Sequence, residues 1–290
     1  MTTIACRQIA VDVGAHLREP CAVDASVRIS WLGQAGFCVS GAGLHLLIDP
    51  YLSDHLARKY HGHAFDHVRM MPAPLRPEQA GVVDYVLCTH RHGDHMDPEA
   101  LPVILETSTG CRLVGPAAER DCICALMDNP QRTILVNDGD VIPLGPSAQV
   151  EVLASAHERL LTNEQGEHHF LGYIVQLGSL RIYHCGDCIP YPGLVERLRA
   201  RRIHVALLPV NGRDAGRSSR GVPGNFTLDE AVDLFVRAEI AVMICHHFGM
   251  FRFNTVSTTR IQERIQLLDL GDRVLVPRVG TAYQFVCKDP

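Results

Sequence analysis

Three histidines and one aspartate lie within six residues of this chain, in the segment Thr-His-Arg-His-Gly-Asp-His that runs from Thr89 to His95. On a regular helix or strand these side chains could not all point the same way, but on a tight loop they can converge. Imidazole and carboxylate groups are ligands that Zn²⁺, Mn²⁺ and Fe²⁺ accept. We therefore predict that His90 and His92 face one metal ion. Asp94 and His95 would face a second ion beside it, and the alternative is a polar loop that binds no ion.

Four ligands from one loop do not complete two catalytic centres, because each ion needs about three protein ligands and an open position for water. Further candidates follow other apolar segments of the chain: His157, Asp187 and the adjacent pair His246 and His247. Active-site groups of open sheets gather where the carboxyl ends of strands meet. We therefore expect these residues to join the first loop in one site. The spacing leaves the choice between His246 and His247 open.

The segments that must position these residues are short, rich in valine, isoleucine and leucine, and flanked by turn residues, which is typical of strands. Five other segments have the start and stop signals of helices, and in one of them Thr227 precedes Glu230 in a capping box. The turn Gly178-Ser179 is so short that the strands beside it must be antiparallel. The predicted strands are 27–31, 44–48, 85–88, 150–153, 172–177, 180–183, 205–209, 241–245 and 273–276, and the predicted helices are 97–106, 116–127, 194–200, 227–238 and 257–268.

No linker interrupts these elements, so they predict one layered α/β (α+β) domain over residues 1–290. The net charge of −5 argues against a nucleic-acid partner bound through a large basic face. No apolar run approaches the roughly 18 residues of a membrane span, so no membrane partner is expected. The eleven scattered cysteines and the lack of a secretory signal predict reduced thiols and a cytoplasmic location.

The pattern His90-x-His92-x-Asp94-His95, with His157, Asp187 and His246 downstream, resembles the signature of the metallo-β-lactamase fold superfamily. Other segments resemble the branch of that superfamily that contains L-ascorbate-6-phosphate lactonase: 31–37, 47–50, 171–173, 183–187, 208–213 and 246–254. The resemblance implies a four-layer αβ/βα sandwich with two mixed sheets and a binuclear metal site at one edge.

The same resemblance assigns the ligands. It implies that the first metal is bound by His90, His92 and His157, and the second by Asp94, His95 and His246, with Asp187 bridging the two. His247 would stand beside the ligands or face the substrate. The ions would be two divalent metals, Zn²⁺ or Mn²⁺, with Fe²⁺ as a further option.

Two such ions can share a hydroxide at neutral pH, and that hydroxide would attack a carbonyl or phosphoryl centre. Asp94 could also pass on a proton, so Asp94 and Asp187 are the predicted catalytic residues. The predicted function is a metal-dependent lactonase that opens a sugar-acid lactone, phosphorylated in one version. The alternatives are a phosphodiesterase or cyclic-phosphate hydrolase on the same site, and a relative that binds metal without hydrolysis.

The predicted substrate is a small anionic molecule, because arginines cluster near the last strand exits, and arginine forks suit phosphate and carboxylate groups. Among the polar residues there, Asn211, Arg213 and Arg252 are the first candidates for substrate binding, ahead of Arg217 and Arg220. Whether the chain forms a homo-oligomer is left open.

Two further groups could do chemistry of their own. Cys185-x-x-Cys188 could be a redox pair, although it surrounds Asp187 and the metal-site interpretation already explains that turn. The long irregular stretch 51–81 could be a lid over the site or a flexible loop. Its histidines at positions 61, 63 and 67 could bind an extra metal, or could simply be polar.

Overall fold

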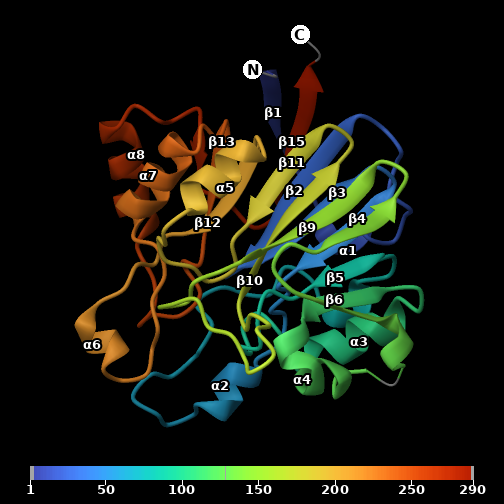
Figure 1. The fold of residues 1–290 in the computed structure, drawn as a ribbon, viewed down its shortest axis with the longest axis horizontal. Coiled ribbons are helices and arrows are strands. Elements are labelled where there is room, and N and C mark those ends of the chain that lie inside the picture. Colours follow the sequence, from blue (N-terminus) through green and yellow to red (C-terminus); the bar gives the residue numbers. More distant parts are fainter. Residues whose placement is uncertain (1–2, 128, 289–290) are drawn as a thin grey trace.

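The structure is a computed structural model that describes residues 3–127 and 129–288, and in this part of the chain fifteen strands form two mixed β-sheets (Figure 1). Across the first sheet the order is β1 (Thr3–Ala10), β15 (Thr281–Lys288), β2 (Ser26–Gly33), β3 (Gly36–Gly41), β4 (Leu44–Ile48), β5 (Tyr85–Leu87), β6 (Arg112–Pro116) and β7 (Thr133–Val136). Across the second sheet it is β14 (Val274–Leu275), β13 (Val242–His246), β12 (Val205–Pro209), β11 (Leu180–His184), β10 (Leu171–Leu177), β9 (Ala148–Ala154) and β8 (Val141–Gly145).

Each sheet changes from antiparallel to parallel pairing part of the way across. In the first sheet the pairing is antiparallel from β1 to β4 and parallel from β4 to β7. In the second sheet it is antiparallel from β8 to β11 and parallel from β11 to β14. Strands β4 and β5, and likewise β11, β12 and β13, therefore end at the same edge of their sheet, where site residues can gather.

The helices lie on the outer faces of the two sheets. Figure 1 shows α5 (Leu194–Ala200), α7 (Leu228–Arg237) and α8 (Thr258–Leu267) together on one side of the molecule, and α3 (Ala100–Thr107) and α4 (Arg120–Cys124) on the other. The short helices α2 (His55–Lys59) and α6 (Ala215–Ser218) lie in long loops at the lower end of that view, and α1 (Val13–His16) follows β1. Single 3-10 turns occupy Pro77–Gln79, Ala117–Glu119 and Pro130–Arg132.

Alternation along the strands sorts apolar side chains into separate layers. In β4, Ile48 faces the core between the sheets, whereas Leu47 faces the outer core with Leu101 and Ile104 of α3. The inner core continues through the second sheet to Leu198 of α5 and to the apolar sides of α7 and α8. Helix, sheet, sheet and helix thus form four layers. The predicted α/β sandwich with two mixed sheets is confirmed.

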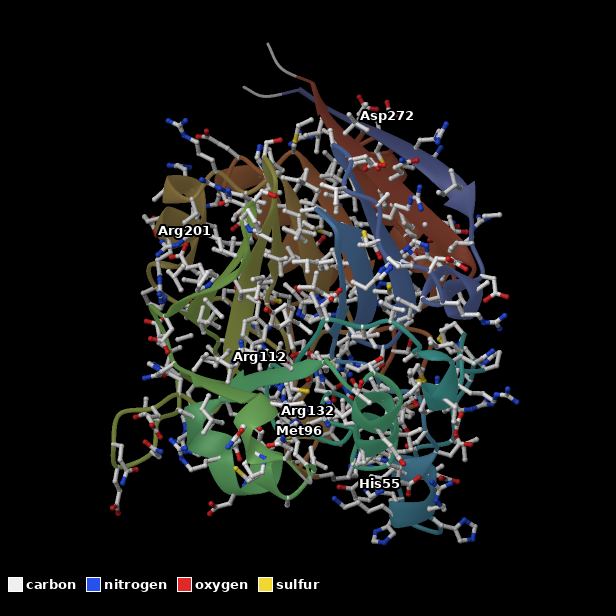
Figure 2. All side chains as sticks on the ribbon, turned by 90° about the vertical axis from the view of Figure 1, so that its right-hand side faces the viewer. His55, Met96, Arg112, Arg132, Arg201 and Asp272 are labelled. Atoms are coloured by element: carbon white, nitrogen blue, oxygen red, sulfur yellow. The ribbon has the colours of Figure 1, made fainter. Side chains whose placement is uncertain are left out.

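Local signals explain where helices begin and end. Helix α7 starts at the predicted capping box, in which Thr227 Oγ1 accepts from the Glu230 amide and Glu230 Oε2 accepts from the Thr227 amide. At the end of α3, the Arg132 guanidinium donates to the carbonyl oxygens of Leu105 and Ser108. Figure 2 shows Arg132 on the side of the molecule that carries α3 and α4.

Each of the nine predicted strands overlaps an observed one, and the turn Gly178-Ser179 joins β10 to β11 with Leu177 opposite Leu180, as predicted. Six strands were not predicted: β1, β3, β6, β7, β8 and β15. Strand β8 contains Pro143, and this proline is tolerated because β8 lies at the edge of the second sheet.

Two predicted helices were wrong in extent. The segment 116–127 holds the end of β6, a 3-10 turn and α4 rather than one helix. Helix α3 starts at Ala100 instead of residue 97, because the Asp97 carboxylate caps the Ala100 amide and also accepts from the amides of Leu52 and Ser53. Within the described residues, no helix has both the length and the apolar character needed to cross a bilayer. All eleven cysteines are free.

Candidate metal centre

The loop between β5 and α3 carries four of the predicted ligands, and Asp49 at the end of β4 holds it in place. The buried Asp49 carboxylate accepts from the Thr89 amide at 2.8 Å and from Thr89 Oγ1 at 2.7 Å. It also lies 2.7 Å from His95 Nδ1. This contact fixes the ring of His95 and leaves its Nε2 atom for the site, as carboxylates behind ligand histidines do in metal proteins.

A glycine allows the second sheet to approach this loop closely. After β11 the chain turns at Gly186, whose φ is +63°, and a Cβ atom there would lie 2.8 Å from the Thr89 side chain. The next residue, Asp187, therefore reaches the loop. Its Oδ1 atom lies 3.3 Å from His95 Nε2, and its Oδ2 atom lies 3.7 Å from His157 Nε2, which follows β9.

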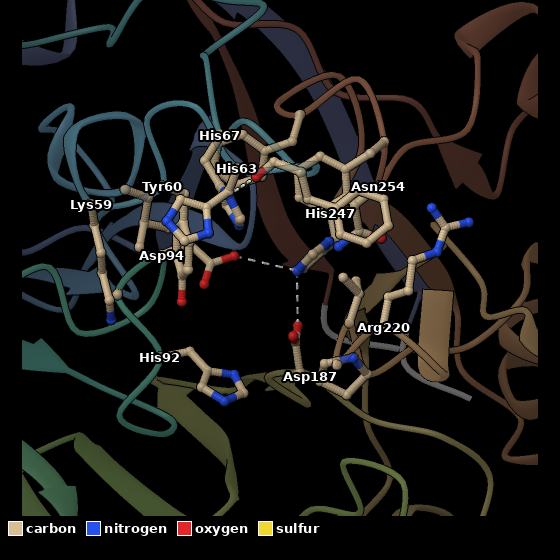
Figure 3. Close-up of a pocket in the computed structure, with 18 of the residues that line it drawn as sticks. Lys59, Tyr60, His63, His67, His92, Asp94, Asp187, Arg220, His247 and Asn254 are labelled. Atoms are coloured by element: carbon tan, nitrogen blue, oxygen red, sulfur yellow. Dashed lines mark hydrogen bonds and ion pairs between the residues drawn. The ribbon is translucent and has the colours of Figure 1, made fainter. Parts of the chain in front are cut away.

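The side chains of the two sheets form two adjacent groups of donor atoms. In each group, every residue offers one ligand atom, and these atoms lie within 4.8 Å of one another. Six of the seven predicted ligands are present, and Figure 3 shows His92, Asp94 and Asp187 around one cavity with His247. The first group is His90, His92, His157 and Asp187, and the second is Asp94, His95 and His247.

The structure does not bring His246, the seventh predicted ligand, to the donor groups. The ring of His246 is buried away from the donor groups, 5.0 Å from the His184 ring and 5.8 Å from the Phe37 ring. Instead His247 Nε2 lies 3.2 Å from Asp187 Oδ1. Successive strand residues face opposite sides, so His246, the last residue of β13, faces the core between the sheets. His247 then turns into the site with a φ of +60°.

Two residues around the donor groups were missed as site residues. Gln34 is buried, and its Nε2 atom donates to Asp94 Oδ2 at 2.8 Å and lies 3.2 Å from His247 Nε2. Asp49 is the other. Like His247, both have left-handed backbones, with φ of +50° at Gln34 and +44° at Asp49. Such strained positions cluster at functional sites. Their segments were part of the family resemblance, but the spacing gave no role for either residue.

Burial and the neighbouring charges set the protonation states of the donors. Burial lowers the pKa of His90 well below its ordinary value and that of His157 to about 4, so both imidazoles are neutral, as metal binding requires. Burial alone would raise the pKa of Asp187, but His247 and His95 outweigh it and hold this pKa well below the ordinary value. For His95, burial lowers the pKa, yet Asp187, Asp49 and Asp94 together raise it well above its ordinary value.

Several donor atoms are buried without a hydrogen-bond partner among the described residues: His95 Nε2, His157 Nε2 and Asp187 Oδ1. Leaving such atoms unpaired costs free energy, so native structures rarely do so. Divalent cations would satisfy these atoms, and the nitrogen and carboxylate donors suit Zn²⁺, Mn²⁺ or Fe²⁺. The residues therefore fit a metal centre. Its occupancy by two ions stays a prediction.

A cavity of about 810 Å³ opens onto the donor groups (Figure 3). Its floor holds His92, Asp94, His157, Asp187 and His247, and its walls come from the long loops that contain α2 and α6 and from the segment after β13. Three cationic side chains line it: Lys59, Arg91 and Arg220.

The predicted substrate contacts are mostly elsewhere. Both terminal guanidinium nitrogens of Arg213 donate to the Glu230 carboxylate at 2.6 Å. Arg213 and Arg252 are exposed and lie outside the cavity lining. Asn211 is buried, and its Nδ2 atom donates to Asn254 Oδ1 at 2.8 Å, so it supports a lining residue without lining the cavity. Only His247 lies where substrate contact was predicted. The structure does not bring Asn211, Arg213 and Arg252 into this lining, and their contact with a substrate stays a prediction.

The structure also places the predicted cysteine pair and the three loop histidines. The thiols of Cys185 and Cys188 are buried beside Asp187 and are not joined by a disulfide. His63 and His67 line the cavity, and His61 is exposed. Among the described residues these three do not belong to a group that could hold a metal ion.

The fold and the site define a metal-binding α/β sandwich, and the family comparison agrees with them. Residues 45–248 match the family described as the beta-lactamase superfamily domain. The chain therefore belongs to the metallo-β-lactamase superfamily. Its resemblance to the branch that contains L-ascorbate-6-phosphate lactonase stays a prediction.

Individual relatives and solved structures cover nearly the whole chain. It is 25% identical over 263 residues to the "UPF0173 metal-dependent hydrolase" of Archaeoglobus fulgidus, an alignment that covers 89% of this chain and 99% of that protein. Igni18, a metallo hydrolase of Ignicoccus hospitalis, superposes with a TM-score of 0.64 and 19% identity over 91% of this chain and 100% of the other. An isothiocyanate hydrolase from Delia radicum gut bacteria superposes with a TM-score of 0.70 and 18% identity, over 88% of this chain and 98% of the other. Both solved structures therefore share the fold of this chain.

Proposed function

We propose that this protein is a metal-dependent hydrolase that opens a lactone ring. The observation that carries the proposal is the pair of adjacent donor groups at the floor of one cavity, which share Asp187 through its contacts with His95 and His157. The name of the Archaeoglobus fulgidus relative, metal-dependent hydrolase, supports the same class of reaction.

The chain's own residues would divide the work as follows. His90, His92 and His157 would hold one ion, and Asp94, His95 and His247 would hold the other, with Asp187 between them. When bound, divalent ions supply Lewis acidity toward the carbonyl oxygen of the substrate and lower the pKa of water. Gln34 holds Asp94 through Oδ2, so Oδ1 of Asp94 is the atom that can take up a proton and return it to the leaving oxygen.

The cavity suits a small anionic substrate. Lys59, Arg91 and Arg220 line it, whereas the only carboxylates of the described lining, Asp94 and Asp187, belong to the donor groups. A sugar-acid lactone, phosphorylated or not, is one substrate of this kind. A phosphodiester would use the same donors, because both reactions place negative charge on oxygens beside the metals.

A paired hydrolysis assay tests the proposal. The protein is reconstituted with Zn²⁺ or Mn²⁺ and given a panel of sugar lactones, lactones with a fused aromatic ring and bis(p-nitrophenyl) phosphate. We expect metal-dependent opening of lactones that stops when a chelator is added. Faster cleavage of the phosphodiester would replace lactonase by phosphodiesterase. A protein that keeps its ions and hydrolyses neither class would contradict the proposal and favour a role in metal binding without hydrolysis.

A further inference from the structure

Aromatic rings from two separate loops meet over the cavity. The ring of Tyr60 stacks on His67 at 4.3 Å, and His67 lies 4.8 Å from Phe253, which in turn lies 4.8 Å from Phe65. Tyr60, Phe65 and His67 belong to the loop that contains α2, and Phe253 belongs to the segment after β13. We call Tyr60, Phe65, His67 and Phe253 the aromatic wall.

The aromatic wall faces the metal centre across the cavity. All four residues line the same cavity as His92 and Asp187, and each is only partly buried, so ring surface is left for a ligand. Figure 3 shows Tyr60 and His67 on the side of the cavity opposite His92. A ring placed between the wall and the donor groups would therefore have its reactive bond next to the metal centre.

Arg220 extends this wall with a positive charge. Its guanidinium lies 5.0 Å from the centre of the Phe65 ring, and its Nε atom donates to the Gly216 carbonyl. Among the described residues Arg220 forms no ion pair with a carboxylate, whereas Arg213 pairs with Glu230 and Arg217 with Asp214. Its charge is therefore available to an anion in the cavity.

We propose that the site takes a substrate with a flat aromatic group that carries an anionic substituent. The ring would pack on the aromatic wall, and the anion would reach Arg220. The hydrolysis of such a substrate rests on the proposed function, whereas its binding to the wall and Arg220 does not. The inference favours aromatic lactones over sugar lactones, because the hydroxyls of a sugar would lose water against the phenyl rings of Phe65 and Phe253, which cannot accept or donate conventional hydrogen bonds.

Calorimetry on the Zn²⁺-loaded protein tests the binding without any need for turnover. The probes are naphthalene-2-sulfonate, octane-1-sulfonate and 2-naphthol, which separate the ring from the charge. We expect one naphthalene-2-sulfonate per chain, bound about tenfold more tightly than octane-1-sulfonate, which corresponds to an aromatic contact at the upper end of the usual range.

Two variants and a matched control assign the contacts. Phe253→Leu should remove the preference for the aromatic sulfonate. Arg220→Gln should weaken naphthalene-2-sulfonate by about tenfold or more and leave 2-naphthol unchanged. Arg252→Gln is the control, because Arg252 adjoins Phe253 in sequence but is exposed outside the cavity lining. Equal affinity for the two sulfonates, or equal losses in Arg220→Gln and Arg252→Gln, would overturn the inference.

Hydrolysis of 3-isochromanone and δ-valerolactone separates this inference from the proposed function. Both lactones have six-membered rings and a primary alkoxide as the leaving group, and only the first carries a fused aromatic ring. We expect the higher kcat/KM for 3-isochromanone. Ring-selective binding without hydrolysis of either lactone would contradict the proposed function and leave the inference intact. Hydrolysis of both lactones at equal kcat/KM, with equal affinity for the two sulfonates, would support the proposed function and overturn the inference.

Discussion

The metal centre and the aromatic wall face each other across one cavity but are built in different ways. The donors of the metal centre follow β5, β9, β11 and β13, and five of the seven are buried. The aromatic wall comes from long loops, and its rings are partly exposed. A reaction centre needs donors held within a fraction of an ångström, which strand ends provide, whereas loops on a rigid scaffold can change without loss of the fold.

The supporting contacts differ in the same sense. Behind the donors stand Asp49 and Gln34, each buried and bonded to a donor side chain, and Gly186 allows the two sheets to approach. The wall is held by contacts among its own rings and by the buried Phe251, whose ring lies 4.9 Å from that of His67 and 6.0 Å from that of Phe253. Substitutions at the centre should therefore remove metal and rate together, and substitutions in the wall should change substrate affinity alone.

The largest effect is expected from Asp187→Ala, which removes the carboxylate that contacts both donor groups. Activity should fall by more than about 100-fold, because replacing a residue that only supports a metal ligand already costs about 10- to 100-fold. The fold should persist, because the core of the two sheets does not include this residue. Circular dichroism and a rate assay would check both points. Global unfolding of the variant would show that Asp187 holds the sheets together rather than the metals.

Adjacent histidines give the sharpest comparison within the centre. His247→Ala should lose about one ion per chain, because its Nε2 atom lies among the donors. His246→Leu should keep both ions, because this ring contacts His184 and Phe37 instead. Metal analysis of the two purified variants decides between them. Loss of metal only in His246→Leu would reverse the assignment made from the geometry.

A smaller effect is expected at the support of the centre. Asp49→Asn should weaken metal binding about 10- to 100-fold, because the amide no longer holds His95 as a charged acceptor does. Asp84→Asn is a matched control: Asp84 precedes β5, at the end of the strand opposite the ligand loop, and accepts from the His45 amide. Metal titrations of both variants measure the difference. If both weaken metal binding equally, Asp49 acts on general stability only.

The smallest effect is expected in the wall. Phe65→Leu should raise KM for an aromatic lactone about fivefold, since an aromatic contact contributes roughly 0.5–1.5 kcal/mol beyond its buried area. Its metal content and its kcat should match those of the unaltered protein. Steady-state kinetics with parallel metal analysis would check this. A loss of metal in this variant would mean that the two regions are not independent.

Sequence reasoning succeeded where the chemistry is local. The ligand loop places four donors within six residues, and β5 directly before it is apolar throughout, so both could be predicted. It is weakest where one residue of register decides which side chain reaches the site. The choice of His247 over His246 depends on a left-handed turn at the end of β13, which neither residue type signals.

Long-range partners explain most of the other differences between the sequence predictions and the structure. Asp49 reaches His95 across 46 residues of sequence, and nothing near Asp49 marks it as a support. Arg213 has the right type for an anion site, but Glu230 of α7 takes both of its terminal nitrogens. Strands such as β1 and β15 have polar residues among the apolar ones, so their pairing with each other is what defines them.

The metal content of the protein tests the central claim most directly. The chain is purified without added metal, reconstituted separately with Zn²⁺, Mn²⁺ and Fe²⁺, freed of excess ion and measured by elemental analysis against protein concentration. Two adjacent donor groups predict close to two ions per chain with at least one of these metals. A content that stays near zero with all three would contradict the account, because buried histidine and aspartate atoms without partners would then have no ion to satisfy them.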